Sequence, residues 1–525
     1  MIGAPVRAGL RRVPATQAWQ GRSAFTTPSR YVLAGGPSLV GPPAAVLDAS
    51  TLAGDAAHPL ADDGVSRALR LRADEISAAF DAIEPTLRGL AAHQFDADFV
   101  ERANRELAGR LGFTLPPASL ATTWSTPLAM NELYARCVVR TFSRLVERRF
   151  DRDLARMSDG ERADALIERW GFHAVDISPC ADGRLSGVVD YILRVPPAVI
   201  VARHSYAGAL FDVERTLRDW EAIELRRWRD GHPNSAAEPT RYLKIAVYHF
   251  SSADPRHAGC AAHGSDEVRA ATAVIDRLER FAAAVSSIHG PGAAVATLAV
   301  GVDTDTDAIR VHVPDIDGTL TPSRFVDNAT LYESTRNLTR DAAKDAIRSA
   351  VALCAGVSDD EPGTAGMRWF CGYLLKNNLG QVDAVRTWYG GAYADRGHTE
   401  RLIVAGDGID DVQLRNLAFT AQWDTVEEGA ADLDIGIRIL RELHASRHVA
   451  VPVIAHVRFD PRIPGADGDA RRRAARLRSA IVARYADLAA QGGLWVEAIV
   501  RAGDGTALAT VDPLPPPPNT GALHA

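Results

Sequence analysis

The sequence predicts a multidomain α+β protein with a disordered N-terminal arm, an all-helical domain and two α/β repeats, of which only the first keeps its functional residues. Its 525 residues are too many for one hydrophobic core. Apolar residues recur at helical spacing before residue 150 and in strand-sized runs after it. We therefore expect the arm at residues 1–60, the helical domain at 61–150, the first α/β domain at 151–399 and its degenerate copy at 400–525.

The arm has the composition of a disordered segment. It is rich in Pro, Gly, Ala and Ser, and no acidic residue precedes Asp48. Its positive charge comes from Arg7, Arg11, Arg12, Arg22 and Arg30. Such a segment buries too little apolar surface to offset the entropy lost on folding. Two interpretations stay open: an unselected tail, or a basic arm that folds onto an acidic partner.

The helical domain is predicted from apolar residues spaced by three, four or seven positions. One such face consists of Leu69, Ile76, Phe80, Ile83, Leu87 and Leu90. A later face consists of Leu128, Leu133, Cys137, Val138, Phe142 and Leu145. Because Cys137 lies on this apolar face, we expect it to be a core residue and not a metal ligand.

In the first α/β domain, short apolar runs alternate with helical stretches. Strands are expected around residues 172–177, 242–250 and 293–302, and a helix at 266–285. Functional sites of α/β sheets form at the carboxyl ends of the strands. Cys180 follows one of these strands, and His249 ends another.

Five chemically distinctive residues lie at these strand ends. Cys180, Asp182 and Arg184 stand together in ISPCADGRLSG, and His249 and Cys260 stand in VYHFSSADPRHAGC. Two thiolates and an imidazole form a three-ligand zinc set that leaves a fourth position open, as catalytic zinc sites do. We predict one Zn²⁺ per chain at this set.

The residues beside the first cysteine suggest how a water on that zinc would be used. Zinc lowers the pKa of bound water from about 15.7 toward 7. Asp182 can accept a hydrogen bond from zinc-bound hydroxide, and Arg184 can keep this carboxylate ionised. The hydroxide would then attack a small electrophile such as CO₂. Whether Asp182 ligates zinc in a resting state stays open.

The C-terminal repeat retains a scaffold without the ligands. VIAHVRFDPRIPGA matches the segment that holds His249, and it places Ala466 opposite Cys260. When ISPCADGRL is laid over LIVAGDGID, Cys180 meets Ala405 and Asp182 meets Asp407. One zinc site, and not two, is therefore expected.

The pattern Cys-x-Asp-x-Arg followed by a His and a second Cys resembles the β-class carbonic anhydrases. Most of that class separate the His and the Cys by two residues, whereas ten intervene here. This departure, the helical domain and the degenerate copy resemble the carboxysome shell carbonic anhydrases. The resemblance implies that Cys180, His249 and Cys260 bind zinc, with Asp182 as the catalytic carboxylate and Arg184 as its partner. It also implies that the two repeats have a β-carbonic-anhydrase-like fold.

The same resemblance implies a cellular role and partners. The reaction would be the reversible hydration of CO₂ to bicarbonate, inside the carboxysome of a bacterial cytoplasm, where it supplies CO₂ to Rubisco. The chain would form a homodimer or a larger assembly. The arm at residues 1–60 would bind Rubisco and shell proteins.

Three alternatives stay open beside this hypothesis. His263 could close the metal set as a fourth ligand of a structural site. The chain could be a carboxysome scaffold whose zinc site is a relic. Asp315 and Asp317, followed by GDGIDD at 406–411, resemble the nucleophile and magnesium motifs of haloacid-dehalogenase phosphatases.

The remaining sequence signals exclude functions or predict simple structure. A net charge of −7 without a long basic helix argues against nucleic acid, and no run of 18 apolar residues suggests a membrane span. Five cysteines are too few for a disulfide framework, which indicates a reducing compartment. Asp303, Asp305 and Asp307 are expected to form an exposed acidic turn, and His398 is a candidate proton shuttle.

Overall fold

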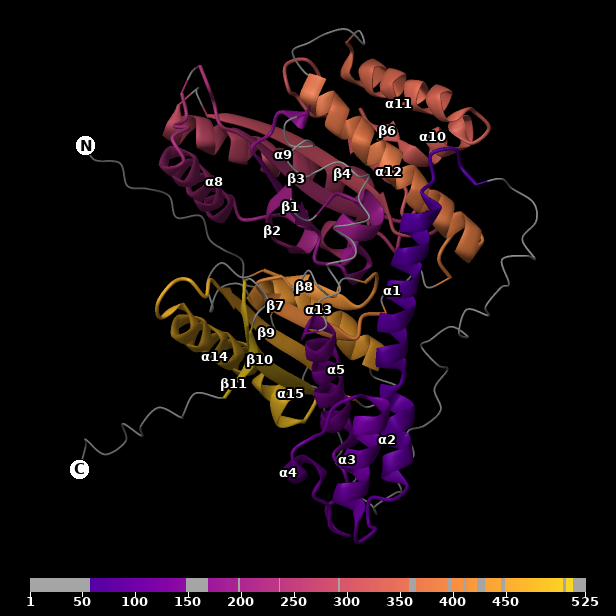
Figure 1. Ribbon diagram of the computed structural model, residues 1–525, viewed down its shortest axis with the longest axis vertical. Coiled ribbons are helices and arrows are strands. Elements are labelled where there is room, and N and C mark those ends of the chain that lie inside the picture. Colours follow the sequence, from indigo (N-terminus) through magenta and orange to yellow (C-terminus); the bar gives the residue numbers. More distant parts are fainter. Residues whose placement is uncertain are drawn as a thin grey trace, which may run out of the picture. The chain divides into compact units, whose positions relative to one another are not determined.

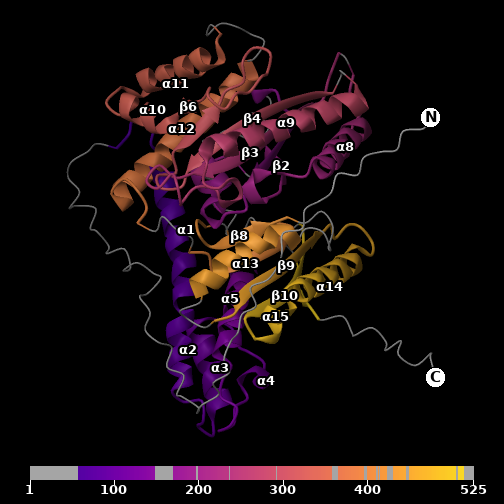
Figure 2. The ribbon, with the colours of Figure 1, turned by 180° about the vertical axis from the view of Figure 1, so that it is seen from behind.

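The structure is a computed structural model that combines helices with two largely parallel sheets (Figures 1 and 2). Its mixed α and β content agrees with the predicted fold class. The arm up to residue 56 and His398 lie outside the described residues. The structure describes residues 57–147, 169–196, 199–235, 237–290, 293–357, 365–394, 399–408, 412, 414–422, 430–444, 449–503 and 507–512.

The last residues of the predicted arm are folded. His58 is buried, its backbone N–H donates to Asp383, and its ring nitrogen Nε2 lies 2.9 Å from Thr335 Oγ1. Leu60 is also buried in the core of the first α/β domain. The predicted limit of the arm at residue 60 is therefore a few residues too late, because these residues find buried partners far along the chain.

The helical domain has the expected apolar faces. Its helices are α1 (Asp63–Asp81), α2 (Ile83–Ala91), α3 (Phe99–Arg110), α4 (Pro117–Leu120) and α5 (Met130–Glu147). All twelve residues of the two predicted apolar faces are buried. Cys137 is among them, which confirms it as a core residue of α5.

The first sheet has the strand order β2-β1-β3-β4-β5-β6. Its strands are β1 (Ala174–Pro179), β2 (Ile200–Arg203), β3 (Arg241–Phe250), β4 (Ala294–Asp303), β5 (Ile309–His312) and β6 (Val326–Asp327). The first four strands are parallel, whereas β5 and β6 are antiparallel to their neighbours. The three strands expected from sequence are β1, β3 and β4.

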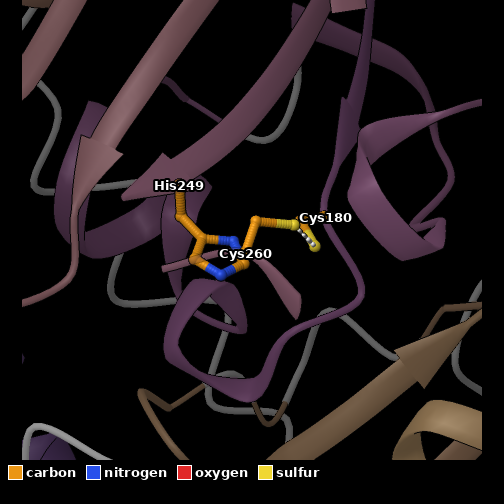
Figure 3. A group of neighbouring side chains, drawn as sticks. All are labelled: Cys180, His249 and Cys260. Atoms are coloured by element: carbon orange, nitrogen blue, oxygen red, sulfur yellow. Dashed lines mark hydrogen bonds between the residues drawn. The ribbon is translucent and has the colours of Figure 1, made fainter. Parts of the chain in front are cut away.

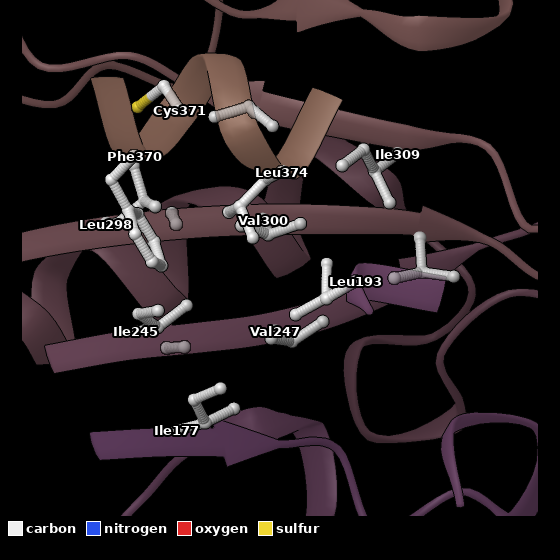
Figure 4. Packing of buried hydrophobic residues seen from close by; sticks show 14 of the residues in the cluster. Ile177, Leu193, Ile245, Val247, Leu298, Val300, Ile309, Phe370, Cys371 and Leu374 are labelled. Atoms are coloured by element: carbon white, nitrogen blue, oxygen red, sulfur yellow. The ribbon is translucent and has the colours of Figure 1, made fainter. Parts of the chain in front are cut away.

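Helices cover both faces of this sheet. They are α8 (Val213–Arg229), α9 (Glu267–His289), α10 (Asn328–Thr335), α11 (Arg340–Ala355) and α12 (Ala365–Tyr389). Figure 4 shows Ile245 and Val247 of β3 on the side of α12, from which Phe370 and Leu374 pack against β4. The side chain of Tyr242 points to the opposite face of β3 from that of Ile245, because side chains alternate along a strand. On that face Tyr242 contacts Phe281 of α9. Short helical turns complete the domain: η1 (Gly183–Leu185), η2 (Val188–Leu193), η4 (Ala207–Ala209) and η5 (Ala261–His263).

A buried ion pair crosses the middle of the sheet. Lys244 of β3 and Asp176 of β1 have no exposed surface, and the Lys244 Nζ donates to Asp176 Oδ2 over 2.7 Å. Lys244 also donates to Ser178, and Tyr242 donates to Asp176. Burial lowers the pKa of Lys244, although the charge of Asp176 opposes this shift. Sequence periodicity did not reveal this pair, because it occupies otherwise apolar strand positions.

The second sheet follows the same path as the first. Its strands are β7 (Leu402–Gly406), β8 (Ala418–Ala421), β9 (Val451–Phe459), β10 (Leu494–Ala502) and β11 (Leu508–Val511), in the order β11-β10-β9-β7-β8. In both sheets the second strand of the unit lies at one edge, followed by the first, third, fourth and fifth. In both sheets the fifth strand of the unit pairs antiparallel with the fourth.

The second sheet is covered by two different parts of the chain. Leu402, Ile454 and Ile499 pack in one core with the helical domain. Ile403 and Val453, on the other face, pack in a separate core with α13 (Ala430–His444) and α14 (Ala466–Arg484), and α15 (Ala486–Ala490) follows. No helix within the described ranges is long and apolar enough to cross a bilayer.

Candidate active site

The two cysteines and the histidine predicted as metal ligands converge at the carboxyl ends of two neighbouring strands. Cys180 follows β1, His249 is the penultimate residue of β3, and Cys260 precedes η5. One ligand atom of each lies within 4.8 Å of the others, and all three residues are buried (Figure 3). Within the part of the chain that the structure describes, this is the single group of three or more His, Cys, Asp or Glu side chains that could hold a metal ion.

The chemistry of this group fits a divalent cation. The two Sγ atoms are 4.0 Å apart, close to the edge of about 3.8 Å that tetrahedral zinc with Zn–S bonds of about 2.3 Å requires. Their mutual hydrogen bond and burial raise the pKa of Cys180, whereas the same hydrogen bond lowers the pKa of Cys260. A bound cation would stabilise both buried sulfurs as thiolates. The His249 Nδ1 is also buried without a hydrogen-bond partner.

His263 does not join the group. It is buried, and its Nε2 lies 3.0 Å from the carbonyl oxygen of Gly208. Because a carbonyl oxygen only accepts, this nitrogen carries a proton and is engaged elsewhere. The structure therefore gives no support to a fourth protein ligand at residue 263.

Asp182 and Arg184 form a buried ion pair with two hydrogen bonds beside the three predicted ligands, which we call the Asp182–Arg184 pair. The Arg184 Nε donates to Asp182 Oδ1 over 2.9 Å, and Nη2 donates to Oδ2 over 2.8 Å. Asp182 also caps η1 by accepting from the backbone N–H of Arg184. Burial lowers the pKa of Arg184, but the charge of Asp182 outweighs it, so the net shift is upward. The Arg184 guanidinium is thus held charged.

The Asp182–Arg184 pair contacts His249 directly. The His249 Nε2 lies 3.3 Å from both Asp182 Oδ2 and Arg184 Nη2. Arg184 is fixed from its other side, where Nη1 donates to the carbonyl of Ala258 over 2.7 Å and to Thr304 Oγ1 over 3.3 Å. All five site residues predicted from sequence therefore lie in one buried cluster.

The acidic turn that contains Thr304 is buried, so the expectation of an exposed turn is wrong. Asp303, Asp305 and Asp307 are all under 5% exposed. Their oxygens accept hydrogen bonds instead of facing water; the donors are Ser251, Ser252, Ala253, Thr306, Gln381 and Tyr393. Burial raises the pKa of Asp307, against the opposing effect of Arg415. This turn holds Thr304 against Arg184, so it helps to fix the position of the Arg184 guanidinium.

Strand pairing relates the two sheets differently from the expected alignment at the first cysteine. The Cys180 N–H donates to the carbonyl of Val247, just after the end of β1. The Asp407 N–H makes the corresponding bond to His456 after β7. Cys180 thus occupies the sheet position of Asp407, not of Ala405.

The position of the histidine shifts in the same way. IAVYHF at the end of β3 aligns without a gap with IAHVRF at the end of β9, which places His249 opposite Arg458, whereas the alignment expected from sequence leaves His249 and His456 one position out of register. The Arg458 N–H donates to Asp407 Oδ2 over 2.7 Å. The ends of the second sheet therefore carry a carboxylate and an arginine where the first carries a thiol and an imidazole.

The candidate phosphatase motif forms an ordinary turn. Asp315 Oδ1 accepts from the backbone N–H groups of Asp317 and Thr319, and Oδ2 accepts from Arg324. Asp317 is exposed, and residues 409–411 of the proposed magnesium motif lie outside the described residues. The Asp315 carboxylate stabilises its own turn, and no contact of these residues favours phosphate chemistry.

Comparison with known proteins covers nearly the whole described chain. Three family models match: Carboxysome Shell Carbonic Anhydrase, N-terminal, at residues 58–150, its catalytic domain at 162–398 and its C-terminal domain at 399–513. A carboxysome shell carbonic anhydrase of Halothiobacillus neapolitanus is 43% identical over 85% of this chain and 88% of its own length. Proteins of the same name from Parasynechococcus marenigrum and Hydrogenovibrio crunogenus are 42% and 38% identical over 86% and 83% of this chain, and over 78% and 83% of their own lengths.

Proposed function

The chain belongs to the carboxysome shell carbonic anhydrase family, and we propose that it catalyses the reversible hydration of CO₂ to bicarbonate at one zinc ion held by Cys180, His249 and Cys260. It is a carbonic anhydrase with a role in carboxysomes. The observation that carries the proposed site is the convergence of two buried thiols and an imidazole within 4.8 Å of one another.

The residues around the ligands suit this reaction. A zinc ion bound here would lower the pKa of its water toward about 7 and supply the nucleophile for CO₂. Asp182 is placed against His249 and can accept the hydrogen bond that orients this nucleophile. Arg184 fixes both oxygens of Asp182 and keeps the carboxylate charged. The low exposure of all five residues strengthens these electrostatic contacts.

Metal analysis coupled to a CO₂-hydration assay tests the proposed site. We expect one zinc per chain in the wild type, and loss of both zinc and activity in Cys260→Ser. Cys137→Ser is the matched control, because Cys137 is an equally buried thiol in the helical domain. Full zinc content and activity in Cys260→Ser would refute the assignment of the ligands.

The C-terminal unit is proposed to be a degenerate copy of the catalytic domain, with a boundary near residue 399. Its support is the shared strand order of the two sheets. Its strand ends carry Asp407 and Arg458 where the first sheet has Cys180 and His249. Asp407 and Arg458 do not make a second zinc set, and Ala466 matches Cys260 in the sequence alignment. A zinc content of two per chain would therefore contradict this proposal.

The proposed partners follow from the family and from the arm. The arginines of residues 1–60 suit a docking role toward an acidic surface, and we propose Rubisco, together with shell proteins, as the partners, with a homodimer as the smallest assembly. The enzyme would supply Rubisco with CO₂ inside the carboxysome. A purely scaffolding role is disfavoured because the Asp182–Arg184 pair remains intact beside the ligands.

A further inference from the structure

The segment that carries the Asp182–Arg184 pair is hydrogen-bonded to the C-terminal unit. The Gly183 N–H donates to Glu400 Oε1 over 3.1 Å, and its carbonyl accepts from the Asn416 N–H over 2.7 Å. The carbonyl of Ala181 accepts from the N–H of Thr420 in the edge strand β8 over 3.1 Å. Both peptide groups that flank Asp182 are thus held by residues far away in the sequence.

Glu400 makes the most specific of these contacts. Gly183 is the first residue of η1, and its N–H would otherwise lack a partner, as the first N–H groups of helices do. Glu400 is 2% exposed, and its side chain packs directly on the Gly183 Cα, where a methyl group would overlap the Glu400 Cγ. The glycine and the glutamate are therefore fitted to each other.

The loop beside Glu400 braces the pair from a second direction. Asn416 has a left-handed backbone, with φ of 60°, which aims its N–H at Gly183. The adjacent Arg415 donates to the carbonyl of Thr304, the residue whose hydroxyl accepts from Arg184. One short loop of the C-terminal unit thus supports both ends of the Asp182–Arg184 pair.

We propose that Glu400 is a positioning residue, by which the C-terminal unit sets the orientation of the Asp182–Arg184 pair through Gly183. The inference rests on the proposed role of that pair. The C-terminal unit then has a role in catalysis although its own described strand ends carry no set of metal-binding residues. It orients the Asp182–Arg184 pair of the first α/β domain. A shift of about 1 Å in a reacting group can lower a rate by about 100-fold, so such support matters for activity.

Two substitutions of Glu400 separate its hydrogen bond from its charge. Glu400→Gln keeps an oxygen that can accept from Gly183, so kcat should stay within about threefold of the wild type. Glu400→Ala frees the Gly183 peptide, so kcat should fall about 10-fold or more while KM and zinc content change little. Hydrogen–deuterium exchange of the peptide that contains Gly183 should become faster in Glu400→Ala alone, which reports on the contact independently of activity.

A double substitution tests whether the fit to Gly183 is the link. Gly183→Ala should be poorly active because its methyl group collides with Glu400, and the variant Gly183→Ala with Glu400→Ala should be more active than Gly183→Ala alone. Asp383→Asn is the matched control, since Asp383 is a buried carboxylate that accepts from a backbone N–H, that of His58, away from the site. It should lower stability without changing kcat or the exchange of the Gly183 peptide.

These results also distinguish the two proposals. Wild-type kcat and wild-type exchange in Glu400→Ala, or a double variant less active than Gly183→Ala alone, would overturn the positioning role. Asp182→Asn, assayed in parallel, tests the proposed function itself: if it stays active, the role of the pair fails whatever Glu400 does to the exchange of the Gly183 peptide.

Discussion

Asp182 and Arg184 are two charged residues that are only 6% and 2% exposed. A buried charge is costly unless a partner compensates it, and breaking such a pair is more harmful than never burying it. Here the planar guanidinium binds both carboxylate oxygens, so the pair is held in one orientation. The carboxylate therefore faces His249 with a fixed geometry.

The catalytic role of Asp182 is best tested with a substitution of equal size. Asp182→Asn removes the negative charge that would accept the hydrogen bond from the nucleophile, yet it retains an oxygen for Arg184. We expect CO₂ hydration to fall about 100-fold or more, with zinc content unchanged. Asp254→Asn, in the partly exposed segment between His249 and Cys260, is the control and should remain active. Near wild-type activity in Asp182→Asn would exclude a catalytic role.

At the scale of residues, the sequence identifies the side chains that gather at the site better than it identifies the residues that support them. Cys180, His249 and Cys260 stand out because thiols and imidazoles at strand ends have few other uses. Glu400 and Thr304 have no such signal, because their contribution depends on contacts with Gly183 and Arg184 that cross more than a hundred positions of sequence. The burial of the acidic turn was missed for the same reason.

At the scale of elements, β3 joins the site to the sheet interior. His249 faces Cys180 and Cys260, while its neighbour Tyr248 lies on the opposite face of β3. The Tyr248 hydroxyl is 2.8 Å from His312 Nε2 on β5. The other ring nitrogen of His312 is 3.0 Å from the carbonyl of Thr321, so the neutral ring satisfies one donor and one acceptor. Burial lowers the pKa of His312 to about 4.

This histidine makes stability depend on pH. Its folded pKa lies below the ordinary value of 6.5, so its contribution is complete above pH 6.5 and is lost as pH falls toward about 4. The loss amounts to about 3 kcal/mol in the free energy of unfolding. Urea unfolding at a series of pH values should therefore show a smaller slope with pH for His312→Gln than for the wild type.

The exposed His257 provides the comparison for this measurement. His257→Gln keeps the buried ring of His312 and should retain the wild-type slope between pH 6.5 and 4. Equal slopes in His312→Gln and the wild type would show that the buried ring does not titrate as proposed.

Elements were predictable where periodicity was strong. β1, β3, β4 and the helices of residues 63–147 follow from apolar spacing. The register between the two sheets could not be predicted from apolar spacing. Residue similarity around Asp407 favours an alignment that differs by two positions from the one that strand pairing gives. Register depends on which backbone groups pair, and short matching segments do not fix it.

At the scale of the whole molecule, the helical domain is not an independent unit. Its apolar face shares a core with the second sheet, in which Phe142 and Leu145 of α5 join Ile454 and Ile499. The helical spacing of apolar residues predicts that this face is buried, but it does not identify the second sheet as the surface against which the face packs. The arrangement of the domains could thus be known only from the structure.

The arm provides a prediction for the assembled protein. Deletion of residues 1–56 should leave kcat and zinc content unchanged, because the described fold begins at residue 57 and contains the whole site. Binding to purified Rubisco in a pull-down or by interferometry should be lost and should weaken with salt, as expected for arginine-mediated contacts. Replacing the five arginines before Asp48 with glutamine should have the same effect. Undiminished Rubisco binding by both variants would assign docking to another surface.

The hydrogen bonds between Gly183 and the C-terminal unit join two parts of one polypeptide. Association within a single chain has an effective concentration that linker length sets, and this concentration does not depend on how many molecules surround it. A site completed by a separate subunit would come apart at high dilution. Here Glu400 and Asn416 belong to the same polypeptide as Gly183. A single newly synthesised chain therefore already contains both the supporting residues and the residues that they support.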